Sequence, residues 1–119
     1  MKDNFNETKT EDLEINCPYL SCYGKAYDGV KTNYIYKLIA AEAYWNGVLD
    51  HRGYVFLNEV YEDLGFPKTE AGDKVGWFKN NPEGDERIVF EIHQTDKMYI
   101  DFNVDGEILS KVKDRENAI

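Results

Sequence analysis

The sequence of 119 residues has little of what marks several large classes of protein. It contains 14 Lys and Arg against 23 Asp and Glu, so it lacks the cationic surface with which proteins coat a nucleic-acid duplex or an anionic membrane. No apolar run approaches the roughly 20 residues of a membrane-spanning helix. The N-terminus lacks the apolar stretch of a secretory signal. We therefore expect a cytoplasmic protein that binds neither nucleic acid nor a membrane directly.

Residues that ligate metals or act as nucleophiles are also scarce. Cys17 and Cys22 are the two cysteines, and the spacer between them is too long for a Cys-x-x-Cys motif, so we expect reduced thiols. The two histidines have no helical metal-ligand spacing. Neither of the two serines lies in a Gly-x-Ser-x-Gly motif. The sequence therefore predicts no metal, no cofactor and no enzymatic activity.

What the chain does contain is typical of one globular domain. Hydrophobic residues make up 42% of the sequence, well above the level of disordered proteins. Residues 1–16 are polar and acidic, and we expect them to form a flexible N-terminal arm. Residues 17–119 are expected to form a single α+β domain, with a turn-rich segment before its first helix.

Two segments have the hydrophobic spacing of helices, at about 33–50 and 58–65. The first has Thr32 or Asn33 as its predicted N-cap and Gly53 just beyond its end. The second has Asn58 as its predicted N-cap and Gly65 as its left-handed C-cap. The apolar positions of the first helix are Tyr34, Leu38, Ala41, Trp45 and Val48, flanked by Ile35, Ile39 and Leu49.

From residue 74 onward the hydrophobic period changes from helical to two, which is typical of strands. We expect an antiparallel meander of three or four strands over about 75–112, with the two helices on one face. The periodicities of the helices and strands together predict one core, formed by Leu38, Trp45, Leu64, Trp77, Phe90 and Phe102. Asp105-Gly106 is a strong signal for a two-residue hairpin. The segment after Gly106 also fits a helix, and the sequence leaves this alternative open.

Two polar groupings have both a structural and a functional interpretation. Asp101, Asn103 and Asp105 match the first half of an EF-hand loop, but Val112 stands where calcium needs a bidentate Glu, so a strand ending in a turn is favoured. Glu42 and Asn46 lie one helical turn apart beside apolar positions. This pair either hydrogen-bonds a neighbouring segment, which we favour, or lines a small pocket.

Part of the chain resembles a known family. The segment from Phe56 to Pro67, then Thr69, Ala71-Gly72 and Val75-Gly76-Trp77, and later the segment from Ile100 to Gly106, follow one pattern. This pattern is similar to that of a family of small uncharacterised proteins of phages and prophages of Gram-positive bacteria. The resemblance implies a phage or mobile-element protein that acts inside a bacterium, and it implies no particular activity.

Acidic residues are concentrated in the second half of the chain, where residues 83–107 contain eight acidic and two basic side chains. Carboxylates that replace phosphates can occupy the basic channel of a nucleic-acid-binding protein, and the opposite charges speed association. We therefore predict a monomeric, anti-CRISPR-like inhibitor whose partner is a basic host protein, such as a defence nuclease. The predicted partner-binding residues are Glu83, Asp85, Glu86, Glu91, Asp101, Asp105 and Glu107.

The alternative is an accessory protein of phage head or tail assembly, for which an oligomer or a large apolar patch is expected. Tyrosine is favoured at protein interfaces, so the tyrosines outside the predicted core are the candidates for such a patch. They are Tyr19, Tyr23, Tyr27, Tyr36 and Tyr54.

Overall fold

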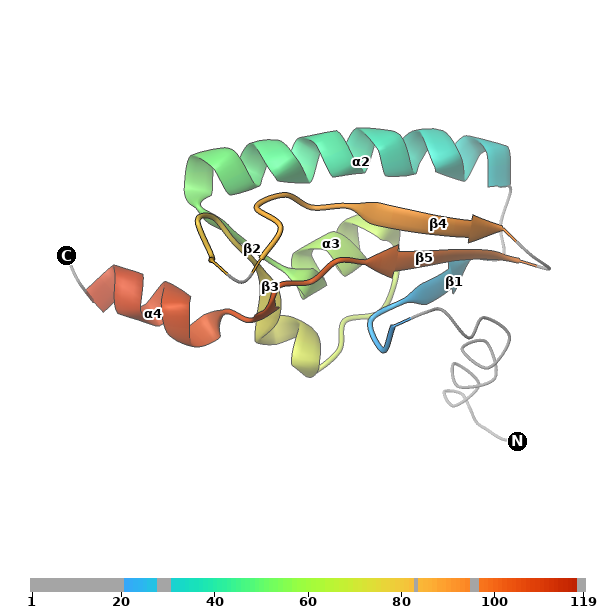
Figure 1. Cartoon of the computed structure of the whole chain (residues 1–119). Helices are drawn as coiled ribbons and strands as arrows, with labels where there is room; N and C mark the ends of the chain where they lie inside the picture. The colour runs from blue at the N-terminus through green and yellow to red at the C-terminus, as the bar shows by residue number, and fades with distance from the viewer. Residues whose placement is uncertain (1–20, 28–30, 83, 95–96, 118–119) are drawn as a thin grey trace.

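A computed structural model describes residues 21–27, 31–82, 84–94 and 97–117, so the predicted arm at 1–16 and Cys17 lie outside the described residues. Helices and strands alternate irregularly along the chain, which confirms the α+β class (Figure 1). None of the helices in these ranges is both long and apolar enough to cross a membrane. The elements are β1 (Lys25–Tyr27), α2 (Lys31–Arg52), β2 (Tyr54–Phe56), α3 (Leu57–Leu64), the short 3-10 helix η1 (Ala71–Asp73), β3 (Val75–Phe78), β4 (Phe90–Gln94), β5 (Met98–Phe102), β6 (Gly106–Glu107) and α4 (Leu109–Asn117).

The described strands form two antiparallel sheets, so the prediction of one meander is wrong in its pairing. One sheet has the order β1-β5-β4 and the other the order β2-β3-β6. β4 and β5 do form a hairpin, but β3 pairs with β2 and β6 and has no free edge for β4. Strand pairing joins segments that are distant in the sequence, and hydrophobic alternation does not identify the partner strand.

Asp105-Gly106 connects the two sheets and is not the predicted hairpin turn. The Asp105 amide donates a hydrogen bond to the Gly76 carbonyl of β3 at 2.8 Å. Gly106 has φ 135°, a conformation that favours glycine, and from there the chain pairs with β3 instead of turning back along β5. After the two residues of β6 the chain forms α4, which is the helical alternative left open by the sequence.

The predicted helix ends are correct at the C-termini and wrong at the N-termini. Gly53 and Gly65 both have positive φ, and the amides of Gly65 and Phe66 donate to the carbonyls of Glu62 and Tyr61. This is the Schellman arrangement expected of a glycine cap. α2 begins at Lys31, so Asn33 lies inside the helix.

α3 begins one residue before Asn58, with Phe56 as its N-cap. The cap contact comes from Glu59, whose carboxylate accepts a hydrogen bond from the Phe56 amide at 2.9 Å. Asn58 is 4% exposed and connects α3 to the loop that follows it. Its side-chain NH2 group donates to the Thr69 carbonyl and to the Asp73 carboxylate at 2.7 Å each, and its side-chain oxygen accepts from the Thr69 backbone amide.

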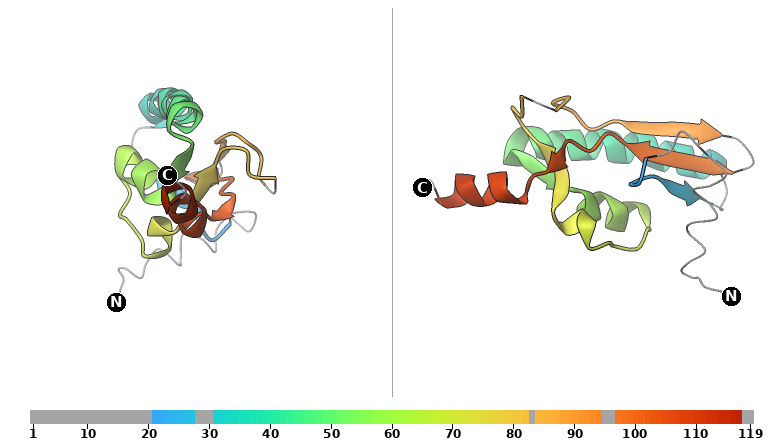
Figure 2. Two further views of the ribbon diagram at one scale, coloured as in Figure 1. Left: turned by 90° about the vertical axis from the view of Figure 1, so that its left-hand side faces the viewer. Right: turned by 60° about the horizontal axis from the view of Figure 1, so that its bottom comes forward.

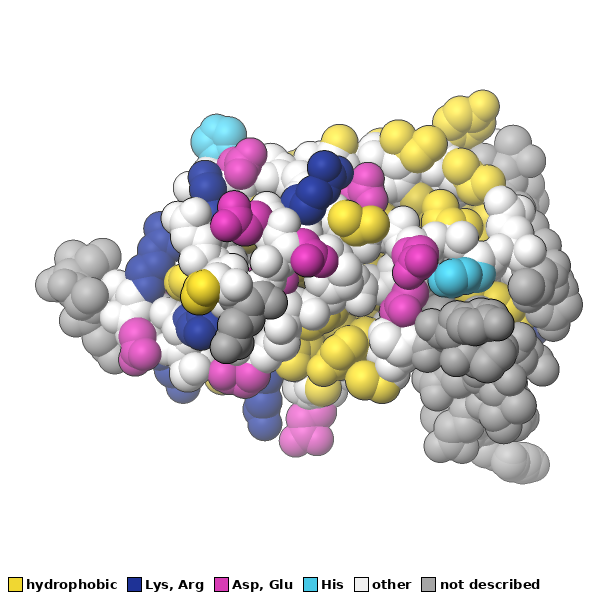
Figure 3. Space-filling model, viewed as in Figure 1, with side chains coloured by type: hydrophobic (Ala, Val, Ile, Leu, Met, Phe, Trp, Pro, Cys, Tyr) yellow, Lys and Arg dark blue, Asp and Glu magenta, His cyan; other side chains and the backbone are white. Residues whose placement is uncertain are grey.

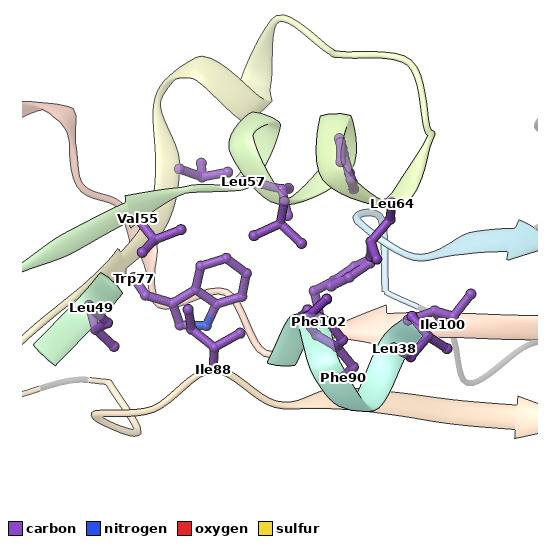
Figure 4. Packing of buried hydrophobic residues seen from close by; sticks show 14 of the residues in the cluster. Leu38, Leu49, Val55, Leu57, Leu64, Trp77, Ile88, Phe90, Ile100 and Phe102 are labelled. Carbon is purple, nitrogen blue, oxygen red and sulfur yellow. The ribbon is translucent and has the colours of Figure 1, made fainter. Parts of the chain in front are cut away.

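The core lies where α2 and α3 pack against the two sheets (Figures 1 and 2). Figure 4 shows apolar side chains from α2, α3 and the strands converging there. Trp45 lies at the margin of this core, where its indole donates to the Asp63 carboxylate at 2.9 Å. The other five residues that the periodicities assign to the core are 7% exposed or less; they are Leu38, Leu64, Trp77, Phe90 and Phe102.

Glu42 and Asn46 attach α2 to the beginning of β4, which confirms the structural interpretation of this pair. The Asn46 side chain accepts from the Ile88 amide at 2.8 Å and donates to the Ile88 carbonyl at 2.9 Å. The Glu42 carboxylate accepts from the Phe90 amide at 2.8 Å. The two side chains thus hydrogen-bond backbone groups in the way that a neighbouring strand would.

Candidate acidic interface

Glu91 and Asp101 lie directly opposite each other on β4 and β5, on the side of the sheet that faces away from Phe90 and Phe102. Two carboxylates at opposed positions repel each other, which is unfavourable for the sheet alone. Asp101 is half-buried and accepts hydrogen bonds from the Ser21 amide at 3.0 Å and the Ser21 hydroxyl at 2.5 Å. Glu91 is exposed, and its carboxylate lies 3.9 Å from the His93 Nε2 atom.

Asp85 and Glu86 extend this acidic surface along the loop before β4. Both are exposed, and Glu86 has φ 63°. Asp85, Glu91 and Asp101 line one shallow groove, which Asn103 also lines. Acidic side chains on this face of the molecule lie over β4, β5 and the preceding loop (Figure 3).

Asn103 positions the loop that carries Asp85, a role that neither its place in the EF-hand comparison nor its place in the family pattern predicted. Its side-chain NH2 group donates to the Asp85 carboxylate at 3.1 Å and to the Arg87 carbonyl at 2.9 Å. Its side-chain oxygen accepts hydrogen bonds from the Val89 backbone amide at 2.7 Å and from the Trp77 indole at 3.0 Å. A buried indole is thus connected through one amide side chain to the rim of the acidic groove.

Asp105 and Glu107, the next two predicted residues, hold the chain together locally. The Asp105 carboxylate is half-buried and accepts from the Phe78 amide at 3.0 Å. Burial raises the pKa of Asp105, although the hydrogen bond from Phe78 acts in the opposite direction. Glu107 accepts from the Ser110 amide and hydroxyl at 2.9 Å each, and these bonds lower the pKa of Glu107. Glu83 lies outside the described residues.

The opposite pKa directions of Asp105 and Glu107 predict opposite effects of pH on stability. A carboxyl whose pKa is raised by folding stabilises the fold below its ordinary pKa, and this stability is lost as the pH rises through the folded value. Relative to the parent, Asp105→Asn should therefore gain stability as the pH rises from about 3 to about 7. Glu107→Gln should lose relative stability over the same range, because its pKa is lowered. Urea unfolding at a series of pH values tests both, and parallel pH profiles for the two variants would contradict the assignment.

The outer side of α2 exposes large apolar side chains, although in the sequence Ile39 stands beside the predicted buried stripe of this helix. Ile39 is 60% exposed, and Tyr36 and Tyr44 are 69% and 61% exposed. Among the tyrosines proposed for an apolar patch, Tyr36 is therefore on the surface. Tyr23, Tyr27 and Tyr54 are half-buried, and Tyr19 lies outside the described residues.

Comparison with known proteins gives one match. The sequence model of a protein family described as "Family of unknown function (DUF6353)" matches residues 1–112. No curated protein and no solved structure matches the chain.

Proposed function

We propose that this chain, which belongs to the family of unknown function DUF6353, is a non-enzymatic protein that binds a basic, nucleic-acid-binding protein. In this proposal it is a phage or mobile-element protein acting in the bacterial cytoplasm, and its partner is a host-defence nuclease or a related factor. The protein would inhibit its partner by occupying the channel that receives nucleic acid.

The observation that carries the proposal is the gathering of Asp85, Glu91 and Asp101 along one groove. These carboxylates come from a loop and two strands, and Glu86 is exposed beside Asp85 on that loop. Opposed carboxylates destabilise a strand pair, so their presence on the open side of the hairpin favours a role in binding. Asp101, Asp105 and Glu107 accept hydrogen bonds within the chain and would contribute to the local potential more than to direct contacts.

The proposal predicts a specific effect of charge reversal. The triple variant Asp85→Lys, Glu86→Lys, Glu91→Lys should associate with a captured partner at least about tenfold more slowly than the parent, because peripheral charges mainly steer association. Binding by the parent should weaken as salt rises from about 50 to about 500 mM, where the Debye length falls to about 4 Å. Nucleic acid should compete with the protein for the partner.

A matched control separates surface chemistry from net charge. Glu62, Glu70 and Asp114 are exposed carboxylates on other parts of the fold. Reversing these three to Lys changes the net charge by the same amount and should leave the association rate within about twofold of the parent. Equal association rates for the two triple variants, measured by surface plasmon resonance, would contradict the proposal.

The assembly function remains a second candidate because α2 exposes Tyr36, Ile39 and Tyr44. A ring or filament of many copies in solution would favour assembly. Specific capture of a basic nucleic-acid-binding protein favours inhibition.

A further inference from the structure

The outer side of α2 is apolar where a surface helix is normally polar. Tyr36, Ile39 and Tyr44 are largely exposed, and Ala40 and Ala43 are exposed beside them. In Figure 3 hydrophobic side chains follow the upper edge of the molecule, over α2. An exposed apolar strip of this kind marks an interaction surface.

The central part of α2 has almost no charged side chains, which would normally favour the exposure of this side to solvent. Between Lys37 and Asp50 the sequence contains one charged residue, Glu42. Its carboxylate is directed at β4, where it accepts the hydrogen bond from the Phe90 amide. The outer side of this segment is therefore uncharged.

Gly47 follows Ala40 by seven residues and Ala43 by four, so the three lie on the same side of α2. No contact within the described chain requires a glycine at Gly47. A Cβ built on Gly47 has nothing within 4 Å, and its φ is not positive. Glycine in a helix interior is less favourable than alanine. A glycine at such a place is expected where a second backbone approaches closely.

We propose that this face of α2 binds the same face of a second copy, in place of the monomer expected from the sequence, with the two helices antiparallel and related by a two-fold axis. Tyr36, Ala40, Ala43, Gly47 and Asp50 recur in alternating steps of four and three residues, which is the spacing of a helix–helix seam. An axis between residues 43 and 44 places Ala40 of each copy opposite Gly47 of the other. Small residues then face each other at the centre, where helices approach most closely.

The charges at the ends of the face favour a second copy in this orientation. Lys37 lies near one end and Asp50 near the other, so the antiparallel arrangement brings each Lys37 to the level of the Asp50 of the other copy. Within one chain these residues have exposed ion pairs with Asp63 at 3.8 Å and Lys79 at 3.6 Å. A parallel arrangement would bring like charges together, which is unfavourable.

Sedimentation velocity over a range of concentrations tests the dimer. The face from residue 36 to residue 51 is about 24 Å long, which corresponds to a small interface, so we expect a dissociation constant in the micromolar range. The parent should change from 13.8 kDa toward twice that mass as concentration rises. Ala43→Arg should raise the dissociation constant about 30-fold or more, because it places a charge at the centre of the face.

The control is Ala71→Arg, the same substitution at an exposed position in η1. It should dimerise like the parent, and circular dichroism should show both variants folded. A parent that stays at 13.8 kDa up to about 1 mM, or equal dissociation constants for the two variants, would overturn the proposal.

Single cysteines test the orientation, in a background with Cys17→Ser and Cys22→Ser. Ala43→Cys lies beside the proposed axis and should form a disulfide with its own copy under mild oxidation. Tyr36→Cys should not, because in the antiparallel pair the two copies of residue 36 are about 22 Å apart along the helices, well beyond the reach of a disulfide. Cross-linking of Tyr36→Cys would overturn the antiparallel arrangement. Because the acidic groove is on β4 and β5, the dimer and the proposed function can fail independently.

Discussion

Trp77→Ala is expected to lower the free energy of unfolding by about 3–5 kcal/mol, the usual cost of removing a fully buried tryptophan. Trp77 is 0% exposed and lies on β3, paired with Val55 of β2. Figure 4 shows its ring among the apolar side chains of the core. Because alanine fills little of this space, the variant loses both buried area and packing contacts.

The substitution should also affect the acidic groove. The Trp77 indole donates to the carbonyl and the side-chain oxygen of Asn103 at 3.0 Å each, and Asn103 holds Asp85. Trp77→Phe keeps most of the ring and removes this donor, so it serves as the second variant. We expect it to destabilise less than Trp77→Ala while still increasing amide hydrogen exchange at Val89. Urea unfolding followed by circular dichroism measures the stability, and a loss below about 1 kcal/mol for Trp77→Ala would contradict the packing described.

Gly76→Ala is the second substitution for which we expect a large effect. A Cβ on Gly76 would lie 2.1 Å from the Val55 carbonyl oxygen and 2.9 Å from the Phe56 Cα. Both atoms belong to the backbone of β2, so no side chain can rotate away and the two strands must separate. We expect a loss of about 3 kcal/mol or more, at the upper end of the range for overpacking.

Gly47→Ala provides the matched control, since the same methyl group there meets nothing within 4 Å. At a concentration where the protein is monomeric, this variant should be about as stable as the parent or up to about 1 kcal/mol more stable, because alanine favours a helix. Thermal unfolding of both variants measures the contrast. Similar midpoints for Gly76→Ala and Gly47→Ala would show that β2 and β3 are not packed as closely as described.

Local sequence patterns were sufficient to predict most of the secondary structure and much of the core. The helical spacing of Leu38 and the alternation that includes Phe90 and Phe102 identified buried positions, because burial on one face imposes a period on the residues of that element. Gly53 and Gly65 identified helix ends, because a left-handed residue excludes most other amino acids. These signals all act within a few residues of one another.

The pairing of the strands and the positions of the polar side chains depended on contacts between distant segments. Asn58, Asn103 and Asp105 look like ordinary capping or turn residues in the sequence, but each hydrogen-bonds a segment 11 or more residues away. Ile39 likewise stands beside the predicted buried stripe of α2 in the sequence, but its side chain is 60% exposed. A local pattern indicates that a residue prefers burial or a turn. The packing of the whole chain decides which distant segment contacts that residue, because strand register and side-chain partners are set only when distant elements come together.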